Sequence, residues 1–145
     1  MAILLSSDDI PKYWEAIKYA VVQVNAVEEK DRERYLNKLL YLLLSSKAQC
    51  FFRLDEKRQL QSIGISRLTV DEITEKKSLN LECLYSFAKV DFKTVWLDDF
   101  RTVYEFAKNN NCDFITTTSS SEKLIWMARE AGLQIRSTNL IMEVT

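Results

Sequence analysis

The feature that most constrains the fold is a change of hydrophobic period along the chain. In roughly the first third, apolar residues recur at three- and four-residue steps, as on one face of a helix. The pattern then becomes strand-like, with β-branched and apolar runs between short polar turns, and later returns to helical spacing. We therefore predict an α/β protein with helices on a central mixed sheet. The expected elements are a short strand at 2–5, helices at 11–27 and 36–44, strands at 49–54, 60–70 and 79–90, a helix at 95–108, a strand at 112–117, a helix ending at Gly132 and a last strand at 135–144.

Polar and special residues mark the ends of these elements. Residues 6–9 (SSDD) offer capping side chains, and Pro11 suits the first turn of a helix. Three asparagines at 109–111 end a helix, because Asn tolerates the left-handed cap conformation. The apolar positions of the helices and strands predict the core. We expect these residues to be mostly buried: Leu39, Leu40, Leu43, Phe51, Ile63, Ile65, Tyr104 and Ile115.

Composition restricts the classes of partner. The 145 residues, 47% hydrophobic and 28% charged, predict one globular domain over residues 1–145. The 20 basic and 21 acidic residues are mixed along the chain, which disfavours nucleic-acid binding. The longest strongly apolar run, residues 39–44, is too short to span a bilayer, and the N-terminus has no signal-peptide pattern. We expect a soluble, cytoplasmic protein with no membrane partner.

The chain has no histidine, which excludes several kinds of active site. Ser-His-Asp and Cys-His nucleophiles and histidine-containing metal sites all need the imidazole that is missing here. The three cysteines, Cys50, Cys83 and Cys112, are far apart and form no C-x-x-C pair. Because each lies in an apolar run, we predict buried free thiols in a reducing compartment, and no metal site.

The order of elements resembles the GNAT superfamily of acyl-CoA-dependent N-acyltransferases. Residues 63–65 (IGI) look like the family's hydrophobic-Gly step on the third strand. Residues 112–115 (CDFI) look like its fifth strand, and residues 130–133 (EAGL) look like its E-x-G-F helix end. The segments IPKYWEAIKYA and KAQCFF are similar to short GNAT-like proteins found in bacteriophage genomes. The resemblance implies that the strands at 79–90 and 112–117 are parallel neighbours joined by the helix at 95–108.

The resemblance also implies a backbone loop that binds the acyl-CoA pyrophosphate, with the pattern R/Q-x-x-G-x-G before the helix. Counting back without gaps places this pattern at the DFKTVW segment. Asp91 stands where the cation is expected, Thr94 and Trp96 stand at the two glycine positions, and Lys93 is the local cation. Glycines there let backbone amides approach the phosphates at a helix N-terminus. We therefore predict a degenerate loop, whose candidate cofactor-binding residues are Lys93, Thr94, Val95 and Trp96.

The family's catalytic residues have only substitutes in this chain. The tyrosine that protonates the leaving thiolate falls at Ala128, which carries no proton to donate. Tyr85, Tyr104 and Ser121 are the candidates to replace it, although Ser121 would equally serve in a helix cap. Glu82 is the candidate general base for an amine if burial raises its pKa, but a strand glutamate also commonly faces solvent.

Two functions therefore remain open. The first is a GNAT-like protein with a degenerate acyl-CoA loop, non-catalytic or altered in its ligand, that acts through a protein partner or as a homo-oligomer. Trp14, Phe92 and Trp96 are its candidate interface aromatics, which core packing would explain as well. The second is an N-acyltransferase with acetyl-CoA or another acyl-CoA as cofactor. In that enzyme the amine would attack directly, with the thioester carbonyl polarised where the fourth and fifth strands splay apart.

Overall fold

The computed structural model describes residues 2–87, 92–119 and 122–144, with the backbone alone at 92–94 and 123. The expected order of helices and strands is confirmed up to the last helix. The elements are β1 (Ile3–Leu4), the 3-10 turn η1 (Ser7–Asp9), α1 (Ile10–Asn25), α2 (Glu29–Leu44), β2 (Ala48–Leu54), β3 (Leu60–Val70), β4 (Lys77–Ser86), α3 (Phe92–Asn109), β5 (Phe114–Thr117) and α4 (Glu122–Glu130).

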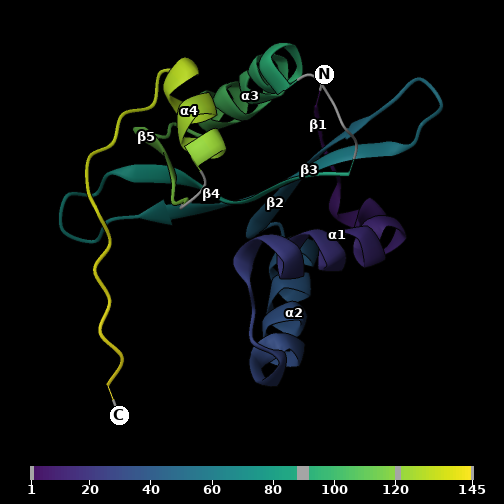
Figure 1. Cartoon of the computed structure of the whole chain (residues 1–145), viewed down its shortest axis with the longest axis horizontal. Helices are drawn as coiled ribbons and strands as arrows, with labels where there is room; N and C mark the ends of the chain where they lie inside the picture. The colour runs from purple at the N-terminus through teal and green to yellow at the C-terminus, as the bar shows by residue number, and fades with distance from the viewer. Residues whose placement is uncertain (1, 88–91, 120–121, 145) are drawn as a thin grey trace.

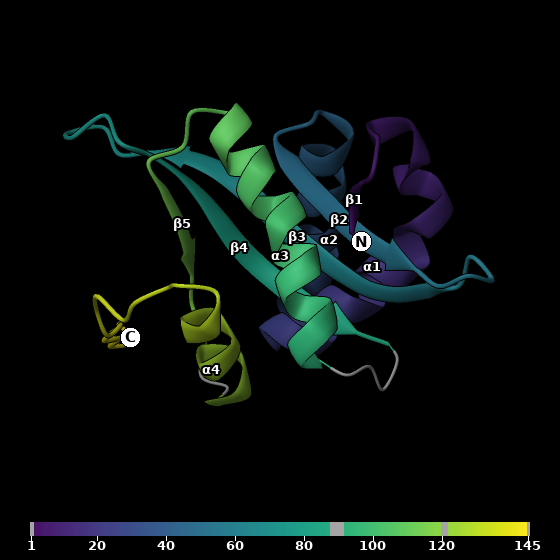
Figure 2. The ribbon, with the colours of Figure 1, turned by 90° about the horizontal axis from the view of Figure 1, so that it is seen from above.

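The strands form a five-stranded mixed sheet in the order β1-β2-β3-β4-β5. The first four strands are antiparallel neighbours, and β5 is parallel to β4. The parallel pairing of β4 and β5, joined through α3, confirms the arrangement that the GNAT resemblance implies. This parallel pair positions the candidate site, because it places the starts of α3 and α4 at the same end of the sheet (Figure 2).

Helices cover both faces of the sheet. Figure 1 shows α1 and α2 on one face and α3 and α4 on the other, and Figure 2 shows α3 crossing the sheet with α4 beside β5. The α1/α2 face buries Ile17, Val21, Leu43, Ile63 and Ile65, each at most 2% exposed. These apolar side chains form one contiguous cluster, which provides the main hydrophobic stabilisation of this layer.

A second cluster lies on the α3/α4 face. Phe51, Leu79 and Leu81 come from the sheet, and Val103 and Ala107 come from α3. The T-shaped contact between Phe51 and Phe106, with ring centroids 5.6 Å apart, joins β2 to α3. The apolar face that predicted α3 from the sequence is therefore the face that packs on the sheet.

A β-bulge in β4 changes which residues face each layer. Ile65 pairs with Cys83 while the next residue, Ser66, pairs with Leu81, so Glu82 is the extra residue. Before the bulge Leu81 packs in the α3/α4 cluster, and after it Cys83 packs in the α1/α2 cluster. Simple alternation along the strand does not predict this change of face.

Most of the special residues at the helix ends have the expected role, but the predicted caps do not. Pro11 lies in the first turn of α1, whereas Ser6 and Asp9 make no side-chain capping hydrogen bond, because the Ser6 hydroxyl donates to the Asp9 carboxylate instead. Asn111 adopts a left-handed conformation with φ 57° just after α3, and Gly132 has φ 97° just after α4. Gly132 therefore has the conformational role that its position in the sequence predicts.

Several detailed expectations are wrong. Residues 135–144 form no strand, because they have no hydrogen-bonded neighbour in the part of the chain that the structure describes. Instead they run away from the sheet (Figure 1). Tyr104 is 53% exposed on α3, so it is no core residue. Leu40 and Ile115 are half-buried rather than buried, whereas the other five predicted core residues are buried.

The cysteine prediction holds for two of the three thiols. Cys50 and Cys83 are buried free thiols, and Cys112 is half-buried and free. Burial raises the pKa of Cys50 and of Cys83 to about 12, so neither thiol ionises appreciably at neutral pH. Within the described residues, no helix combines the length and apolar character needed to cross a membrane.

Candidate ligand cleft between the sheet and helices α3 and α4

The sheet opens where β4 and β5 stop pairing. Their parallel register runs from Ser78↔Phe114 to Leu81↔Thr117. β4 continues to Ser86, whereas β5 ends at Thr117. The last residues of β4 therefore lie beyond the paired part of β5, which is the splay that the N-acyltransferase alternative requires.

A cavity of about 280 Å³ lies beside this splay, between the sheet and the two helices. Its volume is close to the lower end of the roughly 300–1,000 Å³ typical of ligand pockets. Its lining is mainly apolar and comes from β2, β3, β4, α3 and α4. The apolar lining residues include Phe51, Ile63, Leu84, Val95, Trp96, Phe100, Val103, Leu124 and Met127. A small apolar group fits such a lining.

Trp96 closes the cavity on the side of the two helices. It is half-buried in α3, and its indole N–H donates a hydrogen bond to the Met127 carbonyl oxygen of α4 at 3.0 Å. Its ring also packs against Phe100, with centroids 5.8 Å apart. Trp96 therefore ties α3 to α4 across the space that a ligand would enter between them.

One ion pair contributes to the cavity wall. Arg53 of β2 lies 2.8 Å from the Asp99 carboxylate and 3.8 Å from the Asp98 carboxylate, both on α3. Burial raises the pKa of Asp99 above its ordinary value, and this effect exceeds the opposing influence of the Arg53 guanidinium. Arg53 is the one basic residue among the described residues that line the cavity, and its charge is already compensated.

Gly64 gives the cavity part of its shape. A side-chain Cβ at this position would lie 3.3 Å from Leu84 Cδ2 and 3.9 Å from Phe51 Cβ. The glycine of the IGI step thus allows β2 and β4 side chains to meet over β3, at the wall of the cavity.

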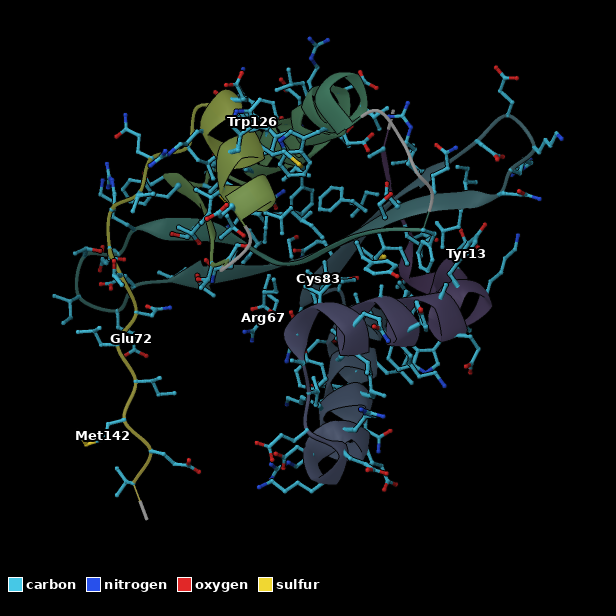
Figure 3. All side chains as sticks on the ribbon, viewed as in Figure 1. Tyr13, Arg67, Glu72, Cys83, Trp126 and Met142 are labelled. Carbon is cyan, nitrogen blue, oxygen red and sulfur yellow. The ribbon has the colours of Figure 1, made fainter. Side chains whose placement is uncertain are left out.

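Glu82, the candidate general base, does not line the cavity. Its carboxylate oxygen Oε1 accepts a hydrogen bond from Arg67 Nε at 2.5 Å and forms an ion pair with Arg67 Nη2 at 2.5 Å. Figure 3 shows Arg67 on the α1/α2 side of the sheet, opposite α3 and α4. This side is the one that alternation along β4 gives to Glu82, because Leu79 and Leu81 face α3 and α4. The predicted catalytic role of Glu82 is therefore not supported by its position.

Tyr85, the candidate general acid, contributes to the cavity wall, but its ring belongs to the opposite layer. It packs edge-on against Tyr19 of α1 at 5.9 Å and against Phe87 at 4.9 Å between centroids. A hydrogen bond with Tyr19 raises the pKa of Tyr85, so its proton is held more tightly than usual. The ring is thus part of an aromatic cluster on the α1 side.

The other predicted site residues have different outcomes. Val95 and Trp96 are helical residues of α3 rather than part of the preceding loop, and both line the cavity. Lys93 and Thr94 are also helical, but their side chains lie outside the described part, as does that of Phe92. Ser121 and Asp91 lie outside the described residues altogether. The gapless count therefore placed the pyrophosphate pattern within the first turns of a helix.

The remaining candidates lie away from the cleft. Tyr104 is exposed on α3 and is not part of the cavity lining. Trp14, a candidate interface aromatic, is half-buried against the α1/α2 cluster, with Lys18 Nζ 6.0 Å from its ring centroid. In the described ranges, no three cysteine or carboxylate side chains gather closely enough to hold a metal ion.

Three residues of the cleft carry no signal in the sequence. Arg53 and Asp99 are separated by 46 residues, and Trp96 and Met127 by 31. Arg53 lies at the end of a predicted strand, and Asp99 and Met127 lie within predicted helices, where charged and apolar residues are ordinary. Only the three-dimensional pairing identifies them as parts of one site.

Comparison with solved structures identifies the fold. No protein-family model matches the chain, and no curated protein does so. A probable acetyltransferase superposes with a TM-score of 0.76 at 10% identity, covering 100% of this chain and 98% of that chain. A putative acetyl transferase from Pyrococcus furiosus gives 0.71 at 19% identity, with coverage of 100% and 99%. The aminoglycoside acetyltransferase meta-AAC0020 from an uncultured soil metagenomic sample, in complex with sisomicin, gives 0.74 at 15% identity, with coverage of 100% and 95%.

These likenesses extend over the whole chain and show that it has the GNAT acetyltransferase fold. At 10–19% identity they show the fold alone. The catalytic chemistry must therefore be judged from the residues of the cleft.

Proposed function

We propose that this GNAT-fold protein binds a small, mainly apolar group in its cleft, transfers no acyl group and acts through a protein partner. In this proposal the scaffold is retained while its ligand is altered. Acyl-CoA fits the cleft poorly, because the cofactor is long and polyanionic whereas the cavity is small and apolar.

The observation that carries the proposal is the hydrogen bond from Trp96 to the Met127 carbonyl. Trp96 lies within α3, at a position that only the gapless count matches to a glycine of the family pattern, and its indole spans from α3 to α4. A bulky side chain here fills the space between the two helices that a ligand bound near the start of α3 would need. The ring and the hydrogen bond also restrain α3 and α4 from separating to admit a longer ligand.

The charges of the cleft support the same conclusion. Asp98 and Asp99 both lie within 4 Å of Arg53, so this corner of the cavity has no net positive charge to offer a phosphate. A phosphate placed here would compete with two carboxylates already bound to the same guanidinium. The cavity therefore favours a neutral, apolar group.

The positions of the candidate catalytic residues support a non-catalytic role. Glu82 is bound to Arg67 on the other side of the sheet, and the Tyr85 ring packs with Tyr19 of α1. Neither of these two residues presents a free acid or base to the cavity. Among the described residues that line the cavity, Asp99 is the carboxylate, and it is paired with Arg53.

One observation favours the alternative, an acyl-CoA-dependent N-acyltransferase. β4 and β5 part after Leu81↔Thr117, which leaves the end of β4 beside the cleft without β5 as a partner. Backbone amides at such an opening are suited to hold an acyl carbonyl. This feature belongs to the scaffold, and it would be equally useful for holding the carbonyl of a ligand that does not react.

Nuclear magnetic resonance titration of the labelled protein distinguishes binding of a small apolar group from binding of acyl-CoA. The probes are hexanamide, a short apolar chain with a neutral polar head, and acetyl-CoA. We expect hexanamide to shift the resonances of Ile63, Leu84, Val103 and other cavity-lining residues, and acetyl-CoA to leave them unchanged at the same concentration. Shifts caused by acetyl-CoA but not by hexanamide would contradict the proposal.

A transfer assay supplies the second readout. Free CoA is separated by chromatography and measured after mixing the protein, acetyl-CoA and a panel of primary amines, with a protein-free mixture as the control. We expect CoA release at the rate seen without protein. Release that requires both the folded chain and an amine would establish the N-acyltransferase instead.

A further inference from the structure

The sheet side of the cavity is formed by two rows of residues that differ in chemistry. Ile63 packs in the α1/α2 cluster, so its neighbours Ser62 and Gly64 lie on the opposite face, toward α3 and α4. Gly64 pairs with Phe51 of β2 and with Leu84 of β4. All three line the cavity, and we call them the apolar row.

The second row lies two residues from the first along each strand. Ser62 pairs with Arg53 of β2 and with Ser86 of β4. These three residues also line the cavity, and we call them the polar row. The Ser86 hydroxyl donates a hydrogen bond to the Gln61 carbonyl oxygen at 3.4 Å, and Arg53 is paired with Asp99. Among the described residues, the Ser62 hydroxyl has no hydrogen-bond partner, so it is left for a ligand.

Charges beside the polar row disfavour an ionised head group. The Arg53 guanidinium lies 2.8 Å from the Asp99 carboxylate, so both signs of charge are present in one wall of the cavity. A head group of either sign beside Ser62 would lie close to a charge of its own sign, in partly buried surroundings where repulsion is stronger than in water. A primary amide is neutral and suits a hydroxyl, because its carbonyl accepts and its NH₂ group donates hydrogen bonds.

We propose that the cleft holds a short apolar chain with a primary amide at one end. The amide binds at the polar row, where the Ser62 hydroxyl donates to its carbonyl oxygen, and the tail lies over the apolar row. Gly64 leaves room for the tail, because a Cβ at this position would lie 3.3 Å from Leu84 Cδ2 and would occupy part of that room. Ser62 and Gly64 are therefore the residues that select the ligand.

The head group and its orientation rest on the proposed function, because both assume a small ligand in the cleft. They add to it the chemistry of the ligand and the two residues that recognise its ends. Ligands of equal length that differ only in the head group separate the two ideas, since binding of any of them supports a small ligand and only their ranking tests the amide.

Titration of the unmodified chain with hexanamide, hexanoate and hexylamine tests the head group. The measurement is made at pH 7, where the last two are ionised, and follows the nuclear magnetic resonance shifts of Leu84 and Val103. We expect hexanamide to bind at least about tenfold more tightly than either ionised ligand. Equal binding of all three, or tighter binding of an ionised one, would overturn the amide and leave a small apolar ligand in place. No binding by any of them would overturn the proposed function as well.

The Ser62→Ala variant tests where the head group lies. It removes the hydroxyl, and we expect hexanamide to bind roughly fivefold more weakly, as for the loss of one neutral hydrogen bond. The matched control is Ser78→Ala, which alters a half-buried serine of β4 that does not line the cavity. Equal affinity of the two variants for hexanamide would mean that the amide does not lie at the polar row, which contradicts the proposal.

The Gly64→Ala variant tests where the tail lies, with hexanamide and butanamide as the two ligands. In the unmodified chain, two more methylenes should favour hexanamide by roughly tenfold. The added methyl should reduce this preference, because the longer tail loses its place over the apolar row. Comparing two ligands on one variant separates a loss of fit from a loss of folded protein. An unchanged preference for hexanamide would contradict this position of the tail.

Discussion

The two faces of the sheet are built from the same kinds of residues but differ in how completely they are packed. On the α1/α2 face, Ile17 and Val21 meet Ile63 and Ile65 in a continuous apolar cluster. On the α3/α4 face, Leu79 and Val103 are as well buried, yet a cavity of about 280 Å³ remains beneath Trp96. The first face is packed throughout, whereas the second leaves a cavity between the sheet and its helices. The difference shows that packing is locally incomplete on one layer of the fold, and this is where we place the ligand in our proposal.

Polar groups are also divided between the two faces. On the cavity side, the partly buried Arg53 and Asp99 form an ion pair against an apolar wall. On the opposite side, Arg67 and Glu82 form a pair nearer to solvent. Charges in an apolar wall lower the stability of the fold unless each one is compensated by its partner. Removing one residue of the Arg53–Asp99 pair should therefore lower stability more than removing one residue of the Arg67–Glu82 pair.

The largest effect on stability is expected from truncating a side chain on the α1/α2 face. Ile65→Ala should lower the free energy of unfolding by about 2–5 kcal/mol, from lost transfer energy plus a new cavity. Val103→Ala should cost less, since its side chain already borders empty space. Urea unfolding of both variants, followed by circular dichroism, measures the two costs. If Val103→Ala cost as much as Ile65→Ala, the two faces would be equally packed.

A smaller effect is expected at the contact that closes the cleft. Trp96→Phe keeps an aromatic ring but removes the N–H that binds the Met127 carbonyl, and should cost about 0.5–1.5 kcal/mol. Trp14→Phe is the matched control, because Trp14 packs in the α1/α2 layer. The variants are compared by thermal unfolding and by the exchange of amide hydrogens in α4. Unchanged exchange in α4 with Trp96→Phe would show that the indole does not hold the two helices together.

The smallest effect is a dependence on pH that comes from Asp99. Its pKa in the folded state lies above the ordinary value of 3.8, because burial outweighs the Arg53 charge. Its contribution to stability is therefore fully present below about pH 3.8 and is lost as pH rises through the folded pKa. Asp99→Asn should remove that loss. The free energy of unfolding of the variant, relative to that of the unmodified protein, should therefore increase with pH, by no more than about 1.4 kcal/mol per pH unit.

Urea unfolding between pH 4 and pH 7 gives the sign of this difference. A relative loss of stability in Asp99→Asn as pH rises would mean that pairing with Arg53 outweighs burial. In that case the Arg53–Asp99 pair in the cavity wall would stabilise the fold through its charges.

The sequence predicts the layers of this fold better than its site. The helical and strand periods give α1 to α4 and β2 to β5 in the right order, because each period reflects one buried face. The start of α2 is wrong, since the helix begins at Glu29 and takes in charged residues that show no apolar period. Residues 135–144 have a strand-like pattern but no strand, since a strand needs a neighbouring edge that local pattern cannot supply. The bulge at Glu82 is likewise a property of pairing with β3, which the residues of β4 alone do not reveal.

From the sequence, we could predict only those site residues that the resemblance to the family pattern points to. Trp96 and Val95 were found through the position of the family loop, although both are helical and not in a loop. The ion pair of Arg53 with Asp99 joins β2 to α3, and no spacing rule connects them. Long-range contacts of this kind depend on how the layers are stacked, so they become visible only with the structure.

Calorimetric titration of the unmodified chain with acetyl-CoA tests the central claim, that the cleft no longer accepts the cofactor of its fold. We predict no binding tighter than about 1 mM, equivalent to roughly −4 kcal/mol, because among the described residues Trp96 bridges the two helices and the charge of Arg53 is already compensated. Trp96→Gly should bind more tightly than the unmodified chain, provided that its melting temperature shows it to be folded. Micromolar binding of acetyl-CoA by the unmodified chain would contradict the claim and support the N-acyltransferase.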